Sequence, residues 1–203
     1  MTRNVYRSLC ALVAIVLLSG MAFAKGAKNS YGVTIKNFGQ MDERFYRGAQ
    51  PKEDEYGQLQ ALGIQTVIDL QEKPKGYEKA AVESLGMRYV NIPMVDKAYP
   101  KEEWVNEFLR VVDAPSTGKF YVHCAGGRHR TGSMGAVYRF EKYGWDFDQV
   151  YAEMKQFDFY TSWGHGDFKT FVEDYARQVQ ERHTAAPTAA RANHVEAVFT
   201  GRN

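Results

Sequence analysis

The stretch His123-Cys124-Ala125-Gly126-Gly127-Arg128-His129-Arg130-Thr131-Gly132 decides the fold, because it joins a strand to a helix through a tight loop. Residues 119–122 before it, three of them aromatic or β-branched, predict a buried strand. Residues 131–140 after it predict an apolar helix with small residues in its first turn. A loop that leads into a helix N-terminus directs several backbone N–H groups to one place, where the helix dipole also favours negative charge. The sequence therefore predicts an anion-binding loop with a cysteine at its base.

Cys124 and Arg130, six residues apart, are predicted to carry the chemistry of this loop. In such a setting the pKa of the Cys124 thiol is lowered, and the thiolate can attack phosphorus to form a thiophosphate intermediate. Arg130 folds back to bind two phosphate oxygens, in a planar geometry that lysine lacks. The Thr131 hydroxyl donates to the Cys124 sulfur and stabilises it as the leaving group of the second step. This pattern predicts cleavage of a phosphate ester.

The rest of the loop is predicted to bind the phosphate oxygens. Its backbone N–H groups contact the oxygens that Arg130 leaves, and the residues concerned are Ala125, Gly126, Gly127, Arg128, His129 and Arg130. Gly126 and Gly127 allow the backbone to wrap around the anion. The side chains of Arg128 and His129 either face solvent or add positive charge to the pocket. His123 either shifts the pKa of the Cys124 thiol or simply ends the strand as a histidine with satisfied hydrogen bonds.

The pattern His123-Cys124-x-x-Gly127-x-x-Arg130-Thr131-Gly132 resembles the signature of the protein tyrosine phosphatase superfamily, in particular its dual-specificity-like members. Residues 45–51, 62–70 and 91–94 are similar to the same group, so the resemblance spans about residues 45–175. It implies a cysteine-dependent phosphatase without a cofactor or metal, acting on a phosphorylated protein or a small-molecule phosphate ester. Residues 127–130 are also similar to the plant and fungal atypical dual-specificity phosphatases. Some of these act on inositol polyphosphates and pyrophosphates, and an inositol polyphosphate phosphatase is therefore the alternative.

Asp96 is the candidate general acid, because an alkoxide or phenoxide leaving group needs a proton. It lies in the loop between a predicted strand and a predicted helix, 28 residues before Cys124, a slightly shorter interval than is usual in the superfamily. The sequence has no Trp-Pro-Asp triplet, which leaves three other carboxylates as candidates: Glu102, Asp158 and Asp167. Asp96 itself could also be a solvated residue of a turn.

The N-terminus predicts export to the periplasm or secretion. Residues 1–24 combine two arginines, the apolar run 9–18 and a small-x-small cleavage site at 22–24, as in a signal peptide. The run is too short for a good membrane span, so no stable span is expected after cleavage. Cleavage would remove Cys10 and leave Cys124 as the one cysteine, which suits a thiol that must stay free in an oxidising compartment. It would also change the formal charge from +2 to 0, which gives no support to nucleic-acid binding.

The remaining residues predict one α/β domain over 25–182, a mainly parallel central sheet flanked by helices, with the active site at the C-terminal ends of the strands. Strands are predicted over 33–37, 44–48, 66–70, 88–92 and 119–122, and helices over 51–62, 76–85, 102–112, 147–156 and 168–180. Asp146 is predicted to cap the helix over 147–156. Residues 183–203 form an Ala-rich tail that is predicted to be mobile.

Two other classes of protein fit parts of the pattern. A catalytically idle phosphate-binding module would need the loop but not its cysteine, arginine and threonine, all of which are present. A sulfurtransferase also places a cysteine in an anion-binding loop, although the long loop that ends in Arg130 favours phosphate.

Overall fold

The computed structural model describes residues 32–200, and it describes side chains for residues 32–185. The predicted signal peptide, residues 1–24, lies outside this range. The core of the fold is a five-stranded sheet in the order β1-β2-β5-β3-β4. Its strands are β1 (Gly39–Gln40), β2 (Phe45–Ala49), β3 (Thr66–Gln71), β4 (Arg88–Met94) and β5 (Phe120–Cys124). Only the pairing of β1 with β2 is antiparallel, so the sheet is mainly parallel, as predicted.

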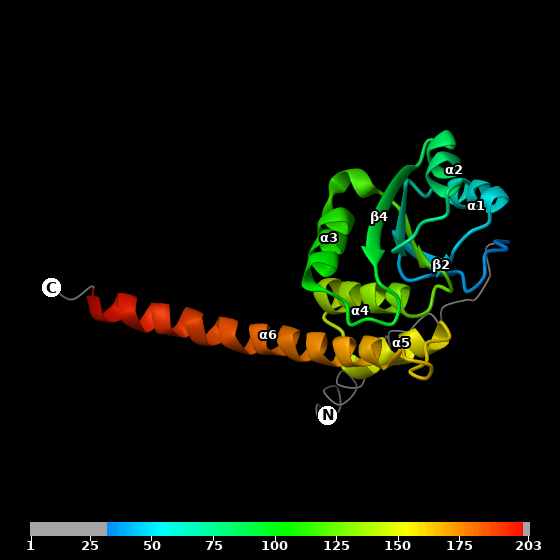
Figure 1. The fold of residues 1–203 in the computed structure, drawn as a ribbon. Coiled ribbons are helices and arrows are strands. Elements are labelled where there is room, and N and C mark those ends of the chain that lie inside the picture. The colour runs from blue at the N-terminus through cyan, green and yellow to red at the C-terminus, as the bar shows by residue number, and fades with distance from the viewer. Residues whose placement is uncertain (1–31, 201–203) are drawn as a thin grey trace, which may run out of the picture.

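Helices cover both faces of the sheet (Figure 1). Side chains of α1 (Tyr56–Ala61) and α2 (Glu78–Ser84) belong to the hydrophobic core on one face. The core on the other face contains side chains from four helices: α3 (Glu102–Asp113), α4 (Arg130–Tyr143), α5 (Phe147–Gln156) and α6 (Gly166–Thr200). The fold class predicted from the sequence, a parallel sheet flanked by helices, is confirmed.

The central strand β5 contributes side chains to the hydrophobic cores on both faces of the sheet. Phe120, Val122 and Cys124 belong to the core on the α4 face, whereas Tyr121 belongs to the core on the α1 face. Successive side chains of a strand point to opposite faces of its sheet. His123 therefore lies on the face opposite Cys124, although the two residues are neighbours in the chain.

Several element boundaries follow the sequence closely. Helix α5 begins after Asp146, whose carboxylate accepts a hydrogen bond from the Gln149 N–H at 2.9 Å, while the Gln149 side chain accepts from the Asp146 N–H at 3.0 Å. This reciprocal capping box satisfies N–H groups that have no partner within the helix. The predicted cap is confirmed, and the bounds of the helix, 147–156, are as predicted.

Three predictions of local structure are wrong. Residues 33–37 form no strand, because Asn37 has the left-handed φ of 54° and ends the extended conformation. The helix predicted over 51–62 begins only at Tyr56, after the 3₁₀ helix Glu53–Glu55. The last helix does not end near residue 180 but continues as α6 to Thr200 (Figure 1). Alanine has the highest helix propensity, which accounts for helix in the Ala-rich stretch, and the mobility of residues 183–203 stays a prediction.

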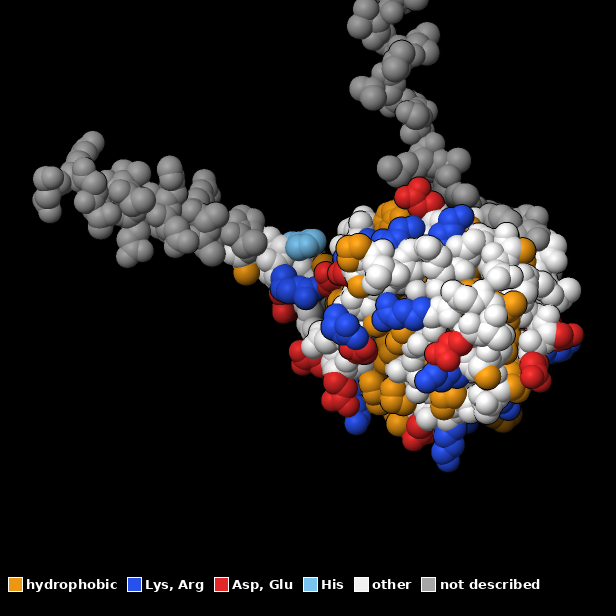
Figure 2. All heavy atoms as spheres, turned by 90° about the horizontal axis from the view of Figure 1, so that it is seen from above, with side chains coloured by type: hydrophobic (Ala, Val, Ile, Leu, Met, Phe, Trp, Pro, Cys, Tyr) orange, Lys and Arg blue, Asp and Glu red, His pale blue; other side chains and the backbone are white. Residues whose placement is uncertain are grey.

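The surface carries charges of both signs. Figure 2 shows Lys and Arg side chains interspersed with Asp and Glu side chains on the face it presents. Within the described range, no helix is both long and apolar enough to cross a membrane.

Candidate active site

The predicted loop lies at the C-terminal end of β5, where it leads into α4. Cys124, the last residue of β5, is paired in register with Ala49, the last residue of β2. A cavity of about 150 Å³ opens above Cys124. The residues that line it are Asp96, Cys124, Ala125, Gly126, Arg128, His129, Arg130, Tyr160 and His165. Five of the six residues predicted to bind phosphate therefore face one cavity, together with the predicted nucleophile and the predicted acid.

Cys124 is buried at the base of this cavity, with 3% of its surface exposed. Burial alone would raise the pKa of its thiol. The positive charge of Arg130 and hydrogen bonds from the Thr131 hydroxyl and from the backbone N–H groups of Thr131 and Arg128 outweigh burial, so the pKa is lowered. The hydroxyl of Thr131 is buried beside the sulfur, whose charged form it stabilises.

Two side chains from outside the loop hold its carbonyl groups. The Asn37 side-chain amide donates to the carbonyl oxygens of Gly126 and Gly127 at 3.3 and 3.1 Å. Arg47, on β2, donates from Nη2 to the Gly127 carbonyl at 2.8 Å. Because C=O and N–H groups of a peptide unit point in opposite directions, fixing these carbonyls away from the cavity turns the N–H groups toward it.

Gly127 is the glycine that the loop requires. Its φ is +66°, and a Cβ at this position would lie 2.3 Å from the backbone of Gly48 on β2. Gly126 differs, because the nearest atom to a Cβ there would be 3.8 Å away. The close approach of the loop to β2 therefore depends on Gly127, while the predicted role of both glycines in wrapping the backbone around an anion stays a prediction.

Arg47 is a functional residue that the sequence analysis missed. It is 1% exposed, its guanidinium carbon lies 4.1 Å from the centre of the Phe157 ring, and burial lowers its pKa to about 10. It lies against Gly132 and Gly135 in α4, where small residues leave space for it. A signal was present, since an arginine interrupts an otherwise apolar strand at a position that faces the core.

Arg130 begins α4 and reaches back over the cavity, where it is 7% exposed. Its Nη1 donates to the Met94 carbonyl at 3.3 Å, and its Nη2 lies 3.5 Å from Asp96 Oδ1. Its Nε is buried and has no hydrogen-bond partner among the described residues. A buried N–H group without a hydrogen-bond partner destabilises the protein, because it has lost its hydrogen bonds to water. This guanidinium is therefore suited to bind an anion, whose oxygen would accept that hydrogen bond.

Asp96 follows β4 and is the one carboxylate among the residues that line the cavity. Its side chain is 51% exposed and reaches Arg130 across the opening. The other three candidates do not line this cavity: Glu102 begins α3, Asp158 follows α5, and Asp167 lies in the first turn of α6, all of them exposed. The geometry therefore favours Asp96 among the four carboxylates for contact with a leaving group.

Arg128, His129 and His165 form one wall of the cavity. The rings of His129 and His165 are stacked with centres 3.7 Å apart, and both residues are 7% exposed. His129 Nε2 donates to the Tyr160 carbonyl at 3.0 Å, while His165 Nδ1 donates to the Ser162 carbonyl at 3.0 Å. Burial and the neighbouring His165 lower the pKa of His129 to about 4, so the His129 ring is neutral near pH 7. His165 enters this wall from the position just before α6.

His123 lies on the other face of the sheet, against two buried acids. Its Nε2 is 2.7 Å from Glu78 Oε1, and its Nδ1 is 3.8 Å from Asp69 Oδ1. All three side chains are fully buried. The sequence analysis missed Asp69 and Glu78, since neither is close to Cys124 in the chain.

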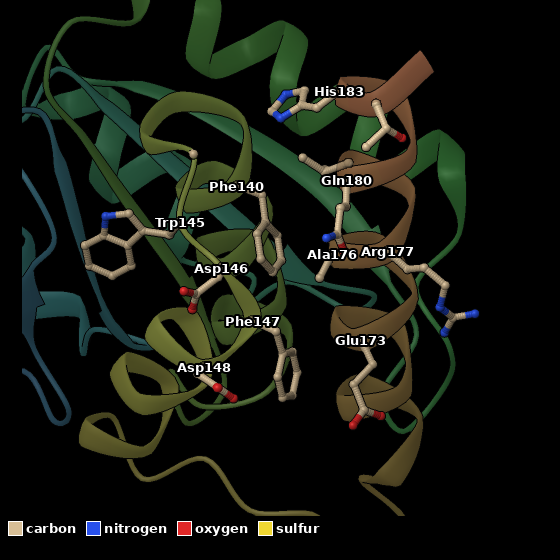
Figure 3. A pocket seen from close by; sticks show the side chains of 13 residues that line it. Phe140, Trp145, Asp146, Phe147, Asp148, Glu173, Ala176, Arg177, Gln180 and His183 are labelled. Carbon is tan, nitrogen blue, oxygen red and sulfur yellow. The ribbon is translucent and has the colours of Figure 1, made fainter. Parts of the chain in front are cut away.

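A larger cavity, of about 710 Å³, lies elsewhere, between the loop after α4 and helix α6. Figure 3 shows Phe140 and Phe147 beside Ala176 and Gln180 of α6 in this cavity. None of the predicted site residues lines it.

The parallel sheet, the cysteine at the base of an anion-binding loop and the arginine above it define a cysteine-based phosphatase of the protein tyrosine phosphatase type. The family model described as "PTP-NADK: DSP-PTPase phosphatase fused to NAD+ Kinase" matches residues 26–174. The chain therefore belongs to this family of dual-specificity-type phosphatases, as the resemblance of its signature implied.

Similar proteins agree with this assignment. "Putative tyrosine-protein phosphatase OCA1" of Mycosarcoma maydis is 29% identical over 126 residues, which are 60% of this chain and 79% of that protein. The crystal structure of P. aeruginosa TpbA superimposes with a TM-score of 0.59 at 25% identity, over 68% of this chain and 84% of that one. The core catalytic domain of the PP-IP phosphatase SIW14 from S. cerevisiae has a TM-score of 0.61 at 20% identity, over 76% and 94% of the two chains.

Proposed function

We propose that this chain is an exported phosphomonoesterase that works through a thiophosphate on Cys124. The observation that carries the proposal is the position of a buried thiol with a lowered pKa beneath Arg130, at the base of a cavity lined by loop residues. In the first step the Cys124 sulfur attacks phosphorus, the ester P–O bond breaks, and Asp96 gives its proton to the leaving oxygen. Arg130 and the loop N–H groups bind the remaining oxygens.

The second step hydrolyses the intermediate. Water attacks phosphorus while the Asp96 carboxylate accepts a proton from it, the S–P bond breaks, and inorganic phosphate leaves. Cys124 departs as a thiolate, which the Thr131 hydroxyl stabilises by donating to the sulfur. The enzyme returns to its starting state with the proton again on Asp96.

Asp96→Asn is expected to remove the proton supply without removing the phosphate site. The loss in kcat should be large for an alkyl phosphate, roughly 10²-fold or more, because an alkoxide is a poor leaving group. It should be much smaller for p-nitrophenyl phosphate, whose phenolate leaves without help. The alkaline limb of the pH–rate profile, which reports an acid that must stay protonated, should flatten. Equal losses on both substrates with that limb unchanged would reject Asp96.

The wall formed by Arg128, His129 and His165 favours a second candidate, hydrolysis of inositol polyphosphates by the same mechanism. Arg128 has a buried Nε without a hydrogen-bond partner in the described range, so its guanidinium can bind another anionic group beside the reacting phosphate. One relative, the "Inositol diphosphatase SIW14" of Saccharomyces cerevisiae, is 23% identical over 140 residues.

A substrate panel tests the proposed function and separates these candidates. Phosphate release is measured from phosphotyrosine and phosphoserine peptides and from inositol hexakisphosphate, beside thiosulfate-to-cyanide sulfur transfer. We expect phosphate release with the highest kcat/KM on the phosphotyrosine peptide and no thiocyanate. Faster release from inositol hexakisphosphate would favour the second candidate. Thiocyanate without phosphate release would indicate a sulfurtransferase, and inactivity in every assay an idle binding module.

Export to the periplasm or the medium is supported by the pattern of residues 1–24, and by the single cysteine that its removal would leave. The mature protein is expected to begin at Lys25. N-terminal sequencing of the protein from the exported fraction checks this, and an intact Met1 in that fraction would contradict it.

A further inference from the structure

A buried cluster of one histidine and two acids lies beneath the catalytic loop, on the face of the sheet opposite Cys124. His123 on β5 is paired in register with Asp69 on the neighbouring strand β3. Glu78 comes from the first turn of α2 and places Oε1 2.7 Å from His123 Nε2. The three side chains are fully buried, so solvent cannot compensate their charges.

His123 is the charged partner of Glu78 in the cluster, and the Gln50 side chain also interacts with the Glu78 carboxylate. Asp69 accepts hydrogen bonds from the Gln71 N–H at 2.8 Å and from the Tyr89 hydroxyl at 2.9 Å. Tyr56, from α1, faces Glu78, and the Tyr121 ring is stacked on the His123 ring with centres 5.7 Å apart. Both phenols are neutral, because burial strongly raises the pKa of each. His123 is therefore the one cation in the cluster.

A buried ion pair is weak evidence for stability, because removing two charges from water costs about as much as their attraction returns. Apolar residues of similar size would fill the same volume without that cost. The pair lies directly beside Cys124 in the chain, because His123 is the preceding residue. Burial alone would lower the pKa of His123, but Glu78 in the first place, with Asp69 and the Cys124 thiolate, raises it. The electrostatic interaction of His123 with Cys124 is reciprocal, so a charged imidazole favours a charged sulfur.

We propose that Glu78 is a positioning residue which, through its ion pair with His123, maintains an imidazolium beneath the catalytic loop and so stabilises the Cys124 thiolate. Glu78 touches neither the cavity nor the substrate, because it lies across the sheet from Cys124. Arg130 and Thr131 act on the sulfur from the substrate side, and the ion pair acts from below. The proposal rests on the role of Cys124 as the nucleophile.

Glu78→Gln tests the proposal, because glutamine retains the size of the side chain and removes its charge. His123 should then lose its proton and Cys124 should become less acidic. The rate of alkylation by iodoacetamide, measured against pH, reports the thiolate directly and requires no turnover. The alkylation rate rises with pH as the thiol ionises, and the midpoint of this rise should move to higher pH in the variant. At pH values below the midpoint we expect alkylation roughly three- to tenfold slower than in the unchanged protein. The acidic limb of kcat/KM should move in the same direction.

Glu55→Gln is the matched control. Glu55 is also buried, 6% exposed, but it bonds to Thr34 and the Lys52 N–H rather than to His123. Its variant should retain the alkylation midpoint of the unchanged protein. An unchanged midpoint in both variants would overturn the proposal while leaving the proposed function intact, whereas failure of that function would appear as inactivity of the unchanged enzyme.

The double variant Glu78→Gln with His123→Gln removes both charges, and it keeps the test decisive if the single variant folds poorly. Its midpoint should equal that of Glu78→Gln, because the second change removes a group that has already lost its charge. A midpoint equal to that of the unchanged protein would contradict the proposal. Circular dichroism confirms in each case that the folded protein is being titrated.

Discussion

Cys124→Ser is expected to lose essentially all turnover, with kcat reduced by roughly 10⁴-fold or more, as when the nucleophile of a covalent mechanism is removed. A serine hydroxyl is almost fully protonated near neutral pH, whereas the pKa of the Cys124 thiol is lowered by Arg130 and by the hydrogen bonds from Thr131 and Arg128, despite its burial. The oxygen is also a weaker nucleophile toward phosphorus. Release of phosphate from p-nitrophenyl phosphate measures the loss.

The same variant should still bind substrate, which separates loss of chemistry from loss of structure. Serine is close to cysteine in volume, and the carbonyl groups of the loop remain held by Asn37 and Arg47. Equilibrium binding of a phosphotyrosine peptide should therefore persist, so that the variant traps its substrate. Turnover within tenfold of the unchanged enzyme would refute the covalent mechanism. Loss of both binding and thermal stability would show instead that the change had disturbed the fold.

Arg130→Lys is expected to lower kcat/KM by roughly 10²-fold or more, through both weaker substrate binding and slower chemistry. Lysine retains the charge but cannot bind two phosphate oxygens with one planar group. It also cannot bind the Met94 carbonyl and face Asp96 from two separate nitrogen atoms, as Arg130 does at 3.3 and 3.5 Å. Steady-state kinetics on p-nitrophenyl phosphate give the ratio.

Arg110→Lys is a suitable control for Arg130→Lys. Arg110 lies on α3, pairs with Glu107 on the same helix, and has a side chain that is 65% exposed. Its replacement should leave kcat/KM unchanged. If Arg130→Lys were as active as this control, Arg130 would not bind the phosphate in the transition state.

The sequence was sufficient to predict those parts of the site that one contiguous segment encodes. The strand, the loop and the start of α4 lie within residues 120–143, and their spacing alone places Cys124 below Arg130. Asp96 could be placed by topology, because loops at the C-terminal ends of parallel strands meet at one edge of a sheet. The capping box at Asp146 is likewise a local pattern.

The residues that could not be predicted are those that reach the site from distant segments. Asn37 lies in a stretch that resembled a strand, and its role depends on a left-handed backbone and on carbonyl groups about 90 residues away in the chain. Asp69 lies in a predicted strand and Glu78 in a predicted helix, and nothing in either segment indicates that the fold buries both beside His123. Hydrophobic periodicity predicts which face of a helix or strand is buried, but it does not predict which other elements pack against that face.

The Asn37 amide has one more contact, with the Phe157 carbonyl at 2.9 Å, so a single side chain joins the catalytic loop to the segment that leads to the Tyr160 wall. The conformational entropy of two loops is therefore lost when the chain folds, before any substrate arrives. Binding a phosphate then requires little further ordering, because the N–H dipoles already point toward the site. Folding therefore orients the N–H dipoles once, and they do not have to be reoriented in each catalytic cycle.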